Sequence, residues 1–204
     1  MGFSVSWIAV RTDRLDELFA QLGAEATSET DECFESDLAG VQLPDGWYLL
    51  QGRGCDHPMI SEASLSRTST LGETVACSIE EHVMFSSAEY WQNGTRSWSI
   101  THAAENGMFD LATTGFPPNV YDTIKVDLVA AQHAKGGEDA DVDMIFDIPL
   151  QVARSLCGYR HDEPPDWREL PVVFSSIRPA KKPWWKPCTR PFRFSRYIRR
   201  QPGE

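Results

Sequence analysis

Two residues that could perform acid–base chemistry, Glu81 and His102, lie on segments that the sequence predicts to pair as strands. The dipeptide Asn93-Gly94 is the strongest signal for a tight hairpin turn in the chain, and it predicts that residues 73–86 and 95–103 form a β-hairpin. Side chains alternate between the two faces of a strand, which puts Glu81 and His102 on the apolar face. A carboxylate and an imidazole held in an apolar pocket could serve as general acid and base.

The same placement also has a purely structural interpretation. A bulge could turn Glu81 outwards, and a buried His102 could be satisfied by a backbone carbonyl. The apolar face is predicted to be core, and it carries Val75, Cys77, Ile79, Val83, Phe85, Trp98 and Ile100. The opposite face is polar and suits solvent or a ligand, with Glu80 and His82 as candidate binding residues beside Thr74, Ser78, Thr95, Ser97, Ser99 and Thr101.

The other short motifs favour ordinary structural interpretations, so no metal and no cofactor is predicted. Asp139, Asp141 and Asp143 have the first spacings of a calcium loop, but the required glycine and final glutamate are missing, which indicates a solvated acidic loop. Cys55-Asp56-His57 is interpreted as a polar turn, since a catalytic Cys and His usually come from distant parts of a chain. His161-Asp162 has no partner ligands at metal-binding spacing.

Charge is divided unequally along the 204 residues. Residues 178–204, the basic tail, contain nine basic residues and one acidic residue, a net charge of +8. The whole chain contains 19 basic and 30 acidic residues. Residues 1–177, the acidic body, therefore contain 10 basic and 29 acidic residues, a net charge of −19. A body this acidic repels nucleic acid and anionic membranes and attracts basic partners.

The basic tail has prolines at 179, 183, 187 and 191, a spacing that excludes a helix and favours extended chain. Its aromatic residues include Trp184 and Trp185, which are candidate binding residues among the basic side chains. The tail could dock on its own acidic body, engage a partner protein, or contact a membrane or nucleic acid. The last two targets are disfavoured because the tethered body carries more than twice the opposing charge.

The pattern of apolar residues and turn signals predicts an α+β fold, with a mostly antiparallel sheet built as a meander around the 73–86/95–103 hairpin and with helices packed on one face. We expect a single domain over residues 1–177, followed by the basic, proline-spaced tail at 178–204. Strands are predicted at 3–10, 47–51, 108–114 and 143–148, helices at 13–22, 58–69, 120–134 and 149–156, and a loop at 25–40.

Five cysteines at irregular spacing, without a C-x-x-C pair, indicate reduced thiols and a cytoplasmic protein. The N-terminus resembles no secretory signal, and no apolar run approaches the roughly 18 residues that a membrane span needs.

These observations lead to three hypotheses of function. The preferred one is a non-enzymatic, cytoplasmic protein-binding domain that engages a basic partner, as an immunity protein, antitoxin or adaptor does. The second is a hydrolase that uses Glu81 and His102, with His82 or His161 nearby. The third is membrane or nucleic-acid binding through the tail.

Overall fold

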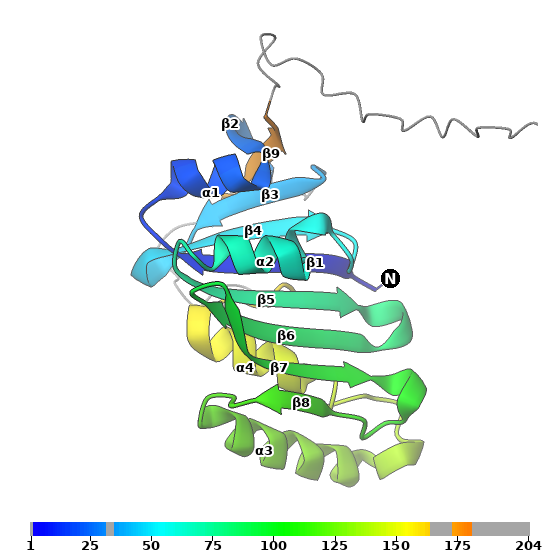
Figure 1. Ribbon diagram of the computed structural model, residues 1–204. Helices are drawn as coiled ribbons and strands as arrows, with labels where there is room; N and C mark the ends of the chain where they lie inside the picture. The colour runs from blue at the N-terminus through cyan, green and yellow to red at the C-terminus, as the bar shows by residue number, and fades with distance from the viewer. Residues whose placement is uncertain (1, 32–34, 164–172, 181–204) are drawn as a thin grey trace, which may run out of the picture.

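A computed structural model describes residues 2–31, 35–163 and 173–180 (Figure 1). These residues form one antiparallel sheet of nine strands in the order β2-β9-β3-β4-β1-β5-β6-β7-β8. The strands are β1 (Ser4–Arg11), β2 (Ala24–Thr30), β3 (Leu38–Gln42), β4 (Trp47–Arg53), β5 (Glu73–Glu80), β6 (Phe85–Gln92), β7 (Thr95–Ala103), β8 (Ala112–Gly115) and β9 (Ser175–Pro179). The α-helices are α1 (Leu15–Leu22), α2 (Glu62–Thr68), α3 (Val120–Lys135) and α4 (Asp147–Cys157).

Strand β1 is buried on both faces near the middle of the sheet. It pairs antiparallel with β4 on one side and β5 on the other. Trp7 and Ala9 belong to a core on one face, and Ile8 and Val10 belong to a second core on the opposite face. A strand rich in β-branched and aromatic residues fits this position, since either face can then bury apolar surface.

Helices therefore cover both faces of the sheet. Helix α4 packs against the face of Trp7, where it buries Leu150 and Ala153. Helices α1 and α2 cover the other face through Leu18 and Leu65, and Figure 1 shows them on the side of the sheet opposite α4. The α+β class and the mostly antiparallel sheet are confirmed, whereas the expectation of helices on a single face is corrected because central strands buried on both sides need cover on both.

The predicted meander is present, with a different division of its first strand. Asn93-Gly94 joins β6 to β7, and Gln92 pairs with Thr95 across the turn. The segment predicted as one strand at 73–86 is divided into β5, a turn at residues 81–84 and the start of β6. Of the predicted core residues, Val75, Cys77, Ile79, Trp98 and Ile100 are buried, whereas Val83 lies in the turn and is 59% exposed.

Two other predicted elements are wrong. The expected loop at 25–40 contains most of β2 and of β3. The polar sequence of β2 gives little strand signal, and both strands are held by pairing with β9. The expected strand at 143–148 is instead the entry to α4. The carboxylate of Asp143 accepts hydrogen bonds from the backbone N–H groups of Ile145 and Phe146, each at 3.0 Å, and so stabilises the turn that leads into the helix.

At the end of the described chain, Arg178 and Pro179 belong to β9 rather than to a separate tail. The guanidinium of Arg178 lies 2.6 Å from the carboxylate of Glu25 on β2. The tryptophans Trp184 and Trp185 lie outside the described residues.

Among the described residues, Cys55, Cys77 and Cys157 are free thiols. No helix in the described ranges is both long and apolar enough to cross a membrane.

A pair of glycine substitutions tests how tightly the end of β8 is held against β7. Gly115 and Gly46 both have positive φ, 70° and 79°, but a Cβ on Gly115 would lie 2.0 Å from the carbonyl oxygen of Ser97, whereas Gly46 has open space. We expect Gly46→Ala to cost about 1 kcal/mol and Gly115→Ala about 3 kcal/mol in the free energy of unfolding. Urea denaturation of the two variants measures this difference, and equal losses would contradict the tight contact.

Candidate functional site

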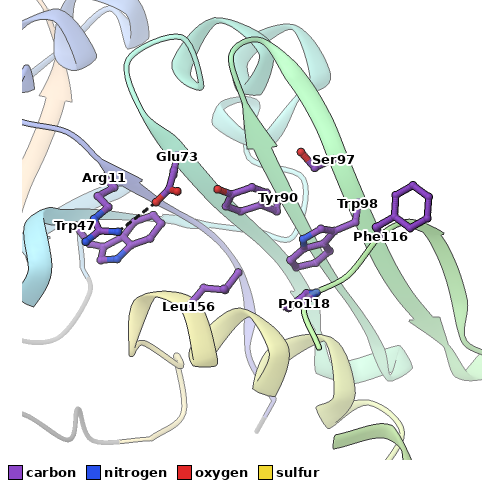
Figure 2. Close-up of a pocket in the computed structure, with 9 residues that line it drawn as sticks. All are labelled: Arg11, Trp47, Glu73, Tyr90, Ser97, Trp98, Phe116, Pro118 and Leu156. Carbon is purple, nitrogen blue, oxygen red and sulfur yellow. Dashed lines mark hydrogen bonds and ion pairs between the residues drawn. The ribbon is translucent and has the colours of Figure 1, made fainter. Parts of the chain in front are cut away.

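A cleft of about 380 Å³ lies on the face of the sheet that α4 covers (Figure 2). Its lining comes from five adjacent strands, from the segment after β8 and from the end of α4. Four of the described lining side chains are aromatic, and the described residues that line the cleft are Arg11, Trp47, Glu73, Tyr90, Ser97, Trp98, Phe116, Pro118 and Leu156. Clefts of this size and character are the usual places where proteins bind ligands.

The aromatic rings of the cleft fall into two groups. Trp47 and Trp98 are each only 4% exposed and form rigid walls that are continuous with the core. Tyr90 lies between them and stacks nearly parallel to Trp98, with ring centroids 6.1 Å apart (Figure 2). Phe116 is 93% exposed at the rim. A ligand can therefore reach Phe116, which is almost fully exposed, and the half-buried Tyr90, which is positioned by its stacking on Trp98.

A carboxylate and a guanidinium form the polar part of the cleft. The Nη1 of Arg11 lies 3.4 Å from the Oε2 of Glu73, and the Arg11 guanidinium lies 6.0 Å from the ring centroid of Trp47. The hydroxyl of Tyr90 points towards Glu73 (Figure 2). Burial, followed by the hydrogen bond and the negative charge of Glu73, raises the pKa of Tyr90 to about 12.

These groups suit binding better than catalysis. Tyr90 keeps its proton at neutral pH, and neither a histidine nor a cysteine is among the described residues that line the cleft. Aromatic rings beside a carboxylate attract a cation through the negative faces of the rings and through direct charge pairing.

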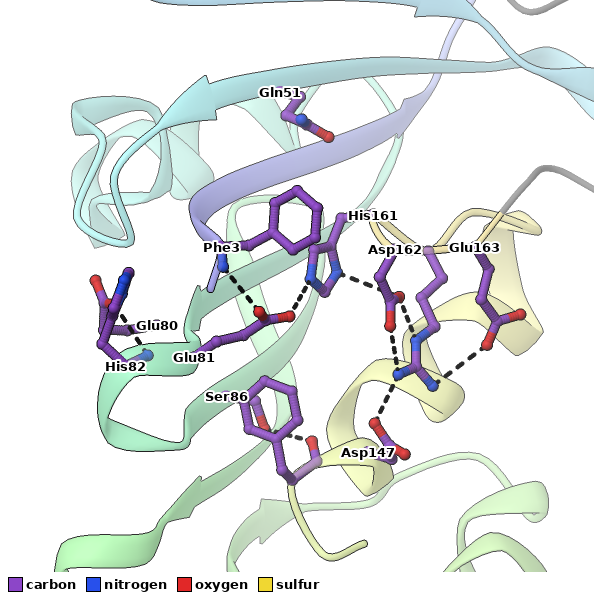
Figure 3. Close-up of polar contacts among 12 residues, drawn as sticks. Phe3, Gln51, Glu80, Glu81, His82, Ser86, Asp147, His161, Asp162 and Glu163 are labelled. Carbon is purple, nitrogen blue, oxygen red and sulfur yellow. Dashed lines mark hydrogen bonds and ion pairs between the residues drawn. The ribbon is translucent and has the colours of Figure 1, made fainter. Parts of the chain in front are cut away.

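The predicted catalytic residue Glu81 lies in the turn after β5, away from His102. Its Oε2 accepts a hydrogen bond from the backbone N–H of Phe3 at 2.8 Å, and its Oε1 lies 3.3 Å from the Nε2 of His161 (Figure 3). The His161 side chain is 1% exposed and meets the ring of Phe3 edge-on. Burial lowers the pKa of His161, although Asp162 and Glu81 act in the opposite direction. This imidazole is sealed inside the protein.

The other predicted catalytic residue, His102, points into the apolar face as expected and is fully buried. Its Nδ1 lies 2.6 Å from the backbone carbonyl oxygen of Asp110, and its Nε2 lies 2.8 Å from the Oδ2 of Asp143. Burial on its own would lower the pKa of His102, but the hydrogen bonds to Asp143 and Asp110 outweigh it and the net shift is upward. The structure therefore does not bring Glu81 and His102 together, and each is paired with a different residue.

The predicted binding residues Glu80 and His82 pair with each other at the surface. The Nδ1 of His82 lies 2.5 Å from the Oε1 of Glu80, and the His82 side chain is 60% exposed. A hydrogen bond from the Ser4 hydroxyl, together with His82, lowers the pKa of Glu80. This pair lies in the turn after β5, and neither residue is among the described residues that line the cleft.

The remaining motifs also have structural roles. Burial raises the pKa of the Cys55 thiol, which opposes a nucleophilic role. The Nδ1 of His57 accepts the N–H of Met59 at 3.3 Å. Asp143 binds His102, whereas Asp139 and Asp141 are exposed. No group of three or more metal-ligating side chains converges within the described part of the chain.

Sequence reasoning missed two sets of residues. One is the cleft itself, whose members are spread from Arg11 to Leu156 and share no local spacing; the aromatic Phe116 ahead of two prolines was the only local signal. The other is Arg160, whose side chain is 8% exposed and lies 2.6 Å from both Asp147 and Asp162. This ion-pair cluster ties the start of α4 to the segment that follows the helix.

Comparison with known proteins found no matching family model, no similar curated protein and no similar solved structure. The fold and the site define an antiparallel α+β domain with an aromatic cleft on its α4 face.

The buried His102–Asp143 pair predicts a specific dependence of stability on pH. The pKa of His102 is raised on folding, so its stabilisation is complete below the unfolded value of about 6.5 and declines as the pH rises through the folded value. We expect His102→Gln to lose about 3 kcal/mol in the free energy of unfolding near pH 6, because Asp143 stays buried without its charged partner. The difference in the free energy of unfolding between this variant and the unsubstituted protein should become smaller towards about pH 9.

Urea unfolding across this pH range measures the gap. The exposed His133 provides the matched control, and His133→Gln should show a small, nearly constant difference. A gap for His102→Gln that widens as the pH rises would contradict a charged His102.

Proposed function

We propose that this protein is a non-enzymatic protein-binding domain that engages a basic partner, and that the aromatic cleft is its docking site. The observation that carries the proposal is a cleft whose reachable groups are Tyr90, Phe116 and the Glu73 carboxylate, in a body with a net charge of −19. The long-range field of such a body favours the approach of a basic protein, and aromatic residues supply contact area once it has docked. Immunity proteins, antitoxins and adaptors in the cytoplasm act in this way.

The geometry gives no support to the hydrolase hypothesis. Both nitrogens of His102 are occupied by Asp110 and Asp143. Glu81 does meet His161, but that imidazole is 1% exposed and lies behind Phe3. A general base needs to reach the proton that it removes, directly or through one water. The buried histidines are better explained as parts of the packed structure.

Binding of membranes or nucleic acid through the basic tail stays the least favoured hypothesis. The charge of the body opposes either target. Docking of the tail on its own body remains a prediction about residues beyond Ala180. In that case the tail competes with an external basic partner for the same acidic surface.

Affinity capture at two salt concentrations tests the proposal. Proteins retained by the full chain from a lysate are identified, purified and measured for their dissociation constants at about 50 and 500 mM salt. We expect a basic partner whose binding weakens by roughly tenfold or more at the higher concentration. A purified partner that is acidic contradicts the proposal, and so does one whose dissociation constant does not change with salt concentration. The proposal is also contradicted if the full chain binds no protein at low salt.

A further inference from the structure

The geometry of the cleft points to a more specific ligand than a basic surface. We propose that the cleft binds an arginine side chain of the partner, with its guanidinium against Tyr90 and Phe116 and paired with Glu73, in place of Arg11. This inference rests on the proposed function, because it names the chemical group of the basic partner that enters the cleft.

The first argument is that the protein already places one guanidinium in this cleft. Arg11 lies 6.0 Å from the ring centroid of Trp47 and 3.4 Å from a carboxylate oxygen of Glu73. It thus makes the same kinds of contact, to an aromatic ring and to Glu73, that an incoming arginine would make with Tyr90, Phe116 and Glu73. The cleft therefore has the chemistry to hold a guanidinium.

The second argument is that the internal pair is weak enough to exchange. The side chains of Arg11 and Glu73 are 53% and 34% exposed, and their contact joins one nitrogen to one oxygen at 3.4 Å. Exposed ion pairs of this kind contribute little net stability. Arg11 also has another acceptor, because its Nε donates to the backbone carbonyl of Asp45 at 3.1 Å. Glu73 can therefore be released to a ligand while Arg11 keeps a partner.

The third argument is that an aromatic ring is accessible at the rim. Phe116 is 93% exposed, so nearly all of its ring surface is open to a ligand. It follows Gly115, whose positive φ and close approach to the Ser97 carbonyl fix the local backbone. Phe116 is thus presented at the rim across from Glu73, where the flat faces of a guanidinium could lie against it (Figure 2).

An arginine fits these groups better than a lysine does. The guanidinium is planar and weakly hydrated, stacks on aromatic rings, and can donate two parallel hydrogen bonds to one carboxylate. An ammonium group is compact and strongly hydrated, and it gains less from a ring. A cleft that served only to concentrate positive charge would not distinguish the two.

The test uses two charge-matched peptides, one that alternates arginine with glycine and one with lysine in place of every arginine. Binding to the full chain is measured by calorimetry. We expect the arginine peptide to bind about tenfold more tightly than the lysine peptide. Glu73→Gln and Phe116→Ala should each remove most of that preference. Their controls are Glu62→Gln, which removes one exposed carboxylate from α2 on the other face, and Val126→Ala, which trims an exposed apolar residue of α3.

Arg11→Gln gives a second and opposite readout. If the incoming arginine displaces Arg11, this substitution should tighten binding of the arginine peptide several-fold. Arg67→Gln removes the same charge from α2 and controls for the general electrostatic gain. A gain no larger than that of Arg67→Gln contradicts the exchange.

The outcomes separate this inference from the proposed function. Equal, salt-sensitive binding of both peptides that Glu73→Gln leaves unchanged overturns the arginine site, while the domain still engages basic partners. Binding of neither peptide at low salt contradicts both. Binding that appears only after Arg190, Arg193, Arg196, Arg199 and Arg200 are changed to glutamine assigns the cleft to the chain's own tail and overturns its assignment to a partner.

Discussion

The burial of β1 on both of its faces is the constraint on which the rest of the structure depends. Trp7 faces the core beneath α4, and Ile8 faces the core beneath α1 and α2. Neither face can be left in water without losing the free energy of burying large apolar side chains. Two helical layers are therefore required. The cleft lies at the margin of one of these layers, between the end of α4 and the segment after β8.

The pKa values of two buried histidines, His102 and His161, are shifted in opposite directions. His102 has a carboxylate partner in Asp143 and a carbonyl partner in Asp110, and its pKa is raised. His161 has a more distant carboxylate in Glu81, an Nδ1 that finds no hydrogen-bond partner among the described residues, and a pKa that burial lowers. In each case the balance between desolvation and hydrogen bonding decides whether the pKa of the imidazole rises or falls. Both arrangements connect α4 or its flanking segments to the sheet, which explains why these residues are structural.

The cleft combines rigid walls with reachable polar and aromatic groups. Trp47 and Trp98 are packed into the core, so the positions of Tyr90 and Glu73 are set before any ligand arrives. A site built in this way loses little conformational entropy on binding. Under the proposed function, the charge of the body favours the approach of a basic partner, and the proposed arginine pocket selects which partner binds.

The sequence by itself determined the local elements and the division of charge. Asn93-Gly94 gave the hairpin between β6 and β7, and Gly23 gave the end of α1 in a left-handed conformation, because turn and cap residues act over a few bonds. Only the tertiary structure decided that polar residues 24–30 form a strand and that Glu81 pairs with His161 rather than His102. It also brought Arg11, Glu73 and Phe116 to one cleft. Such contacts join residues far apart in the chain, and their spacing along the sequence carries no record of the distances between them.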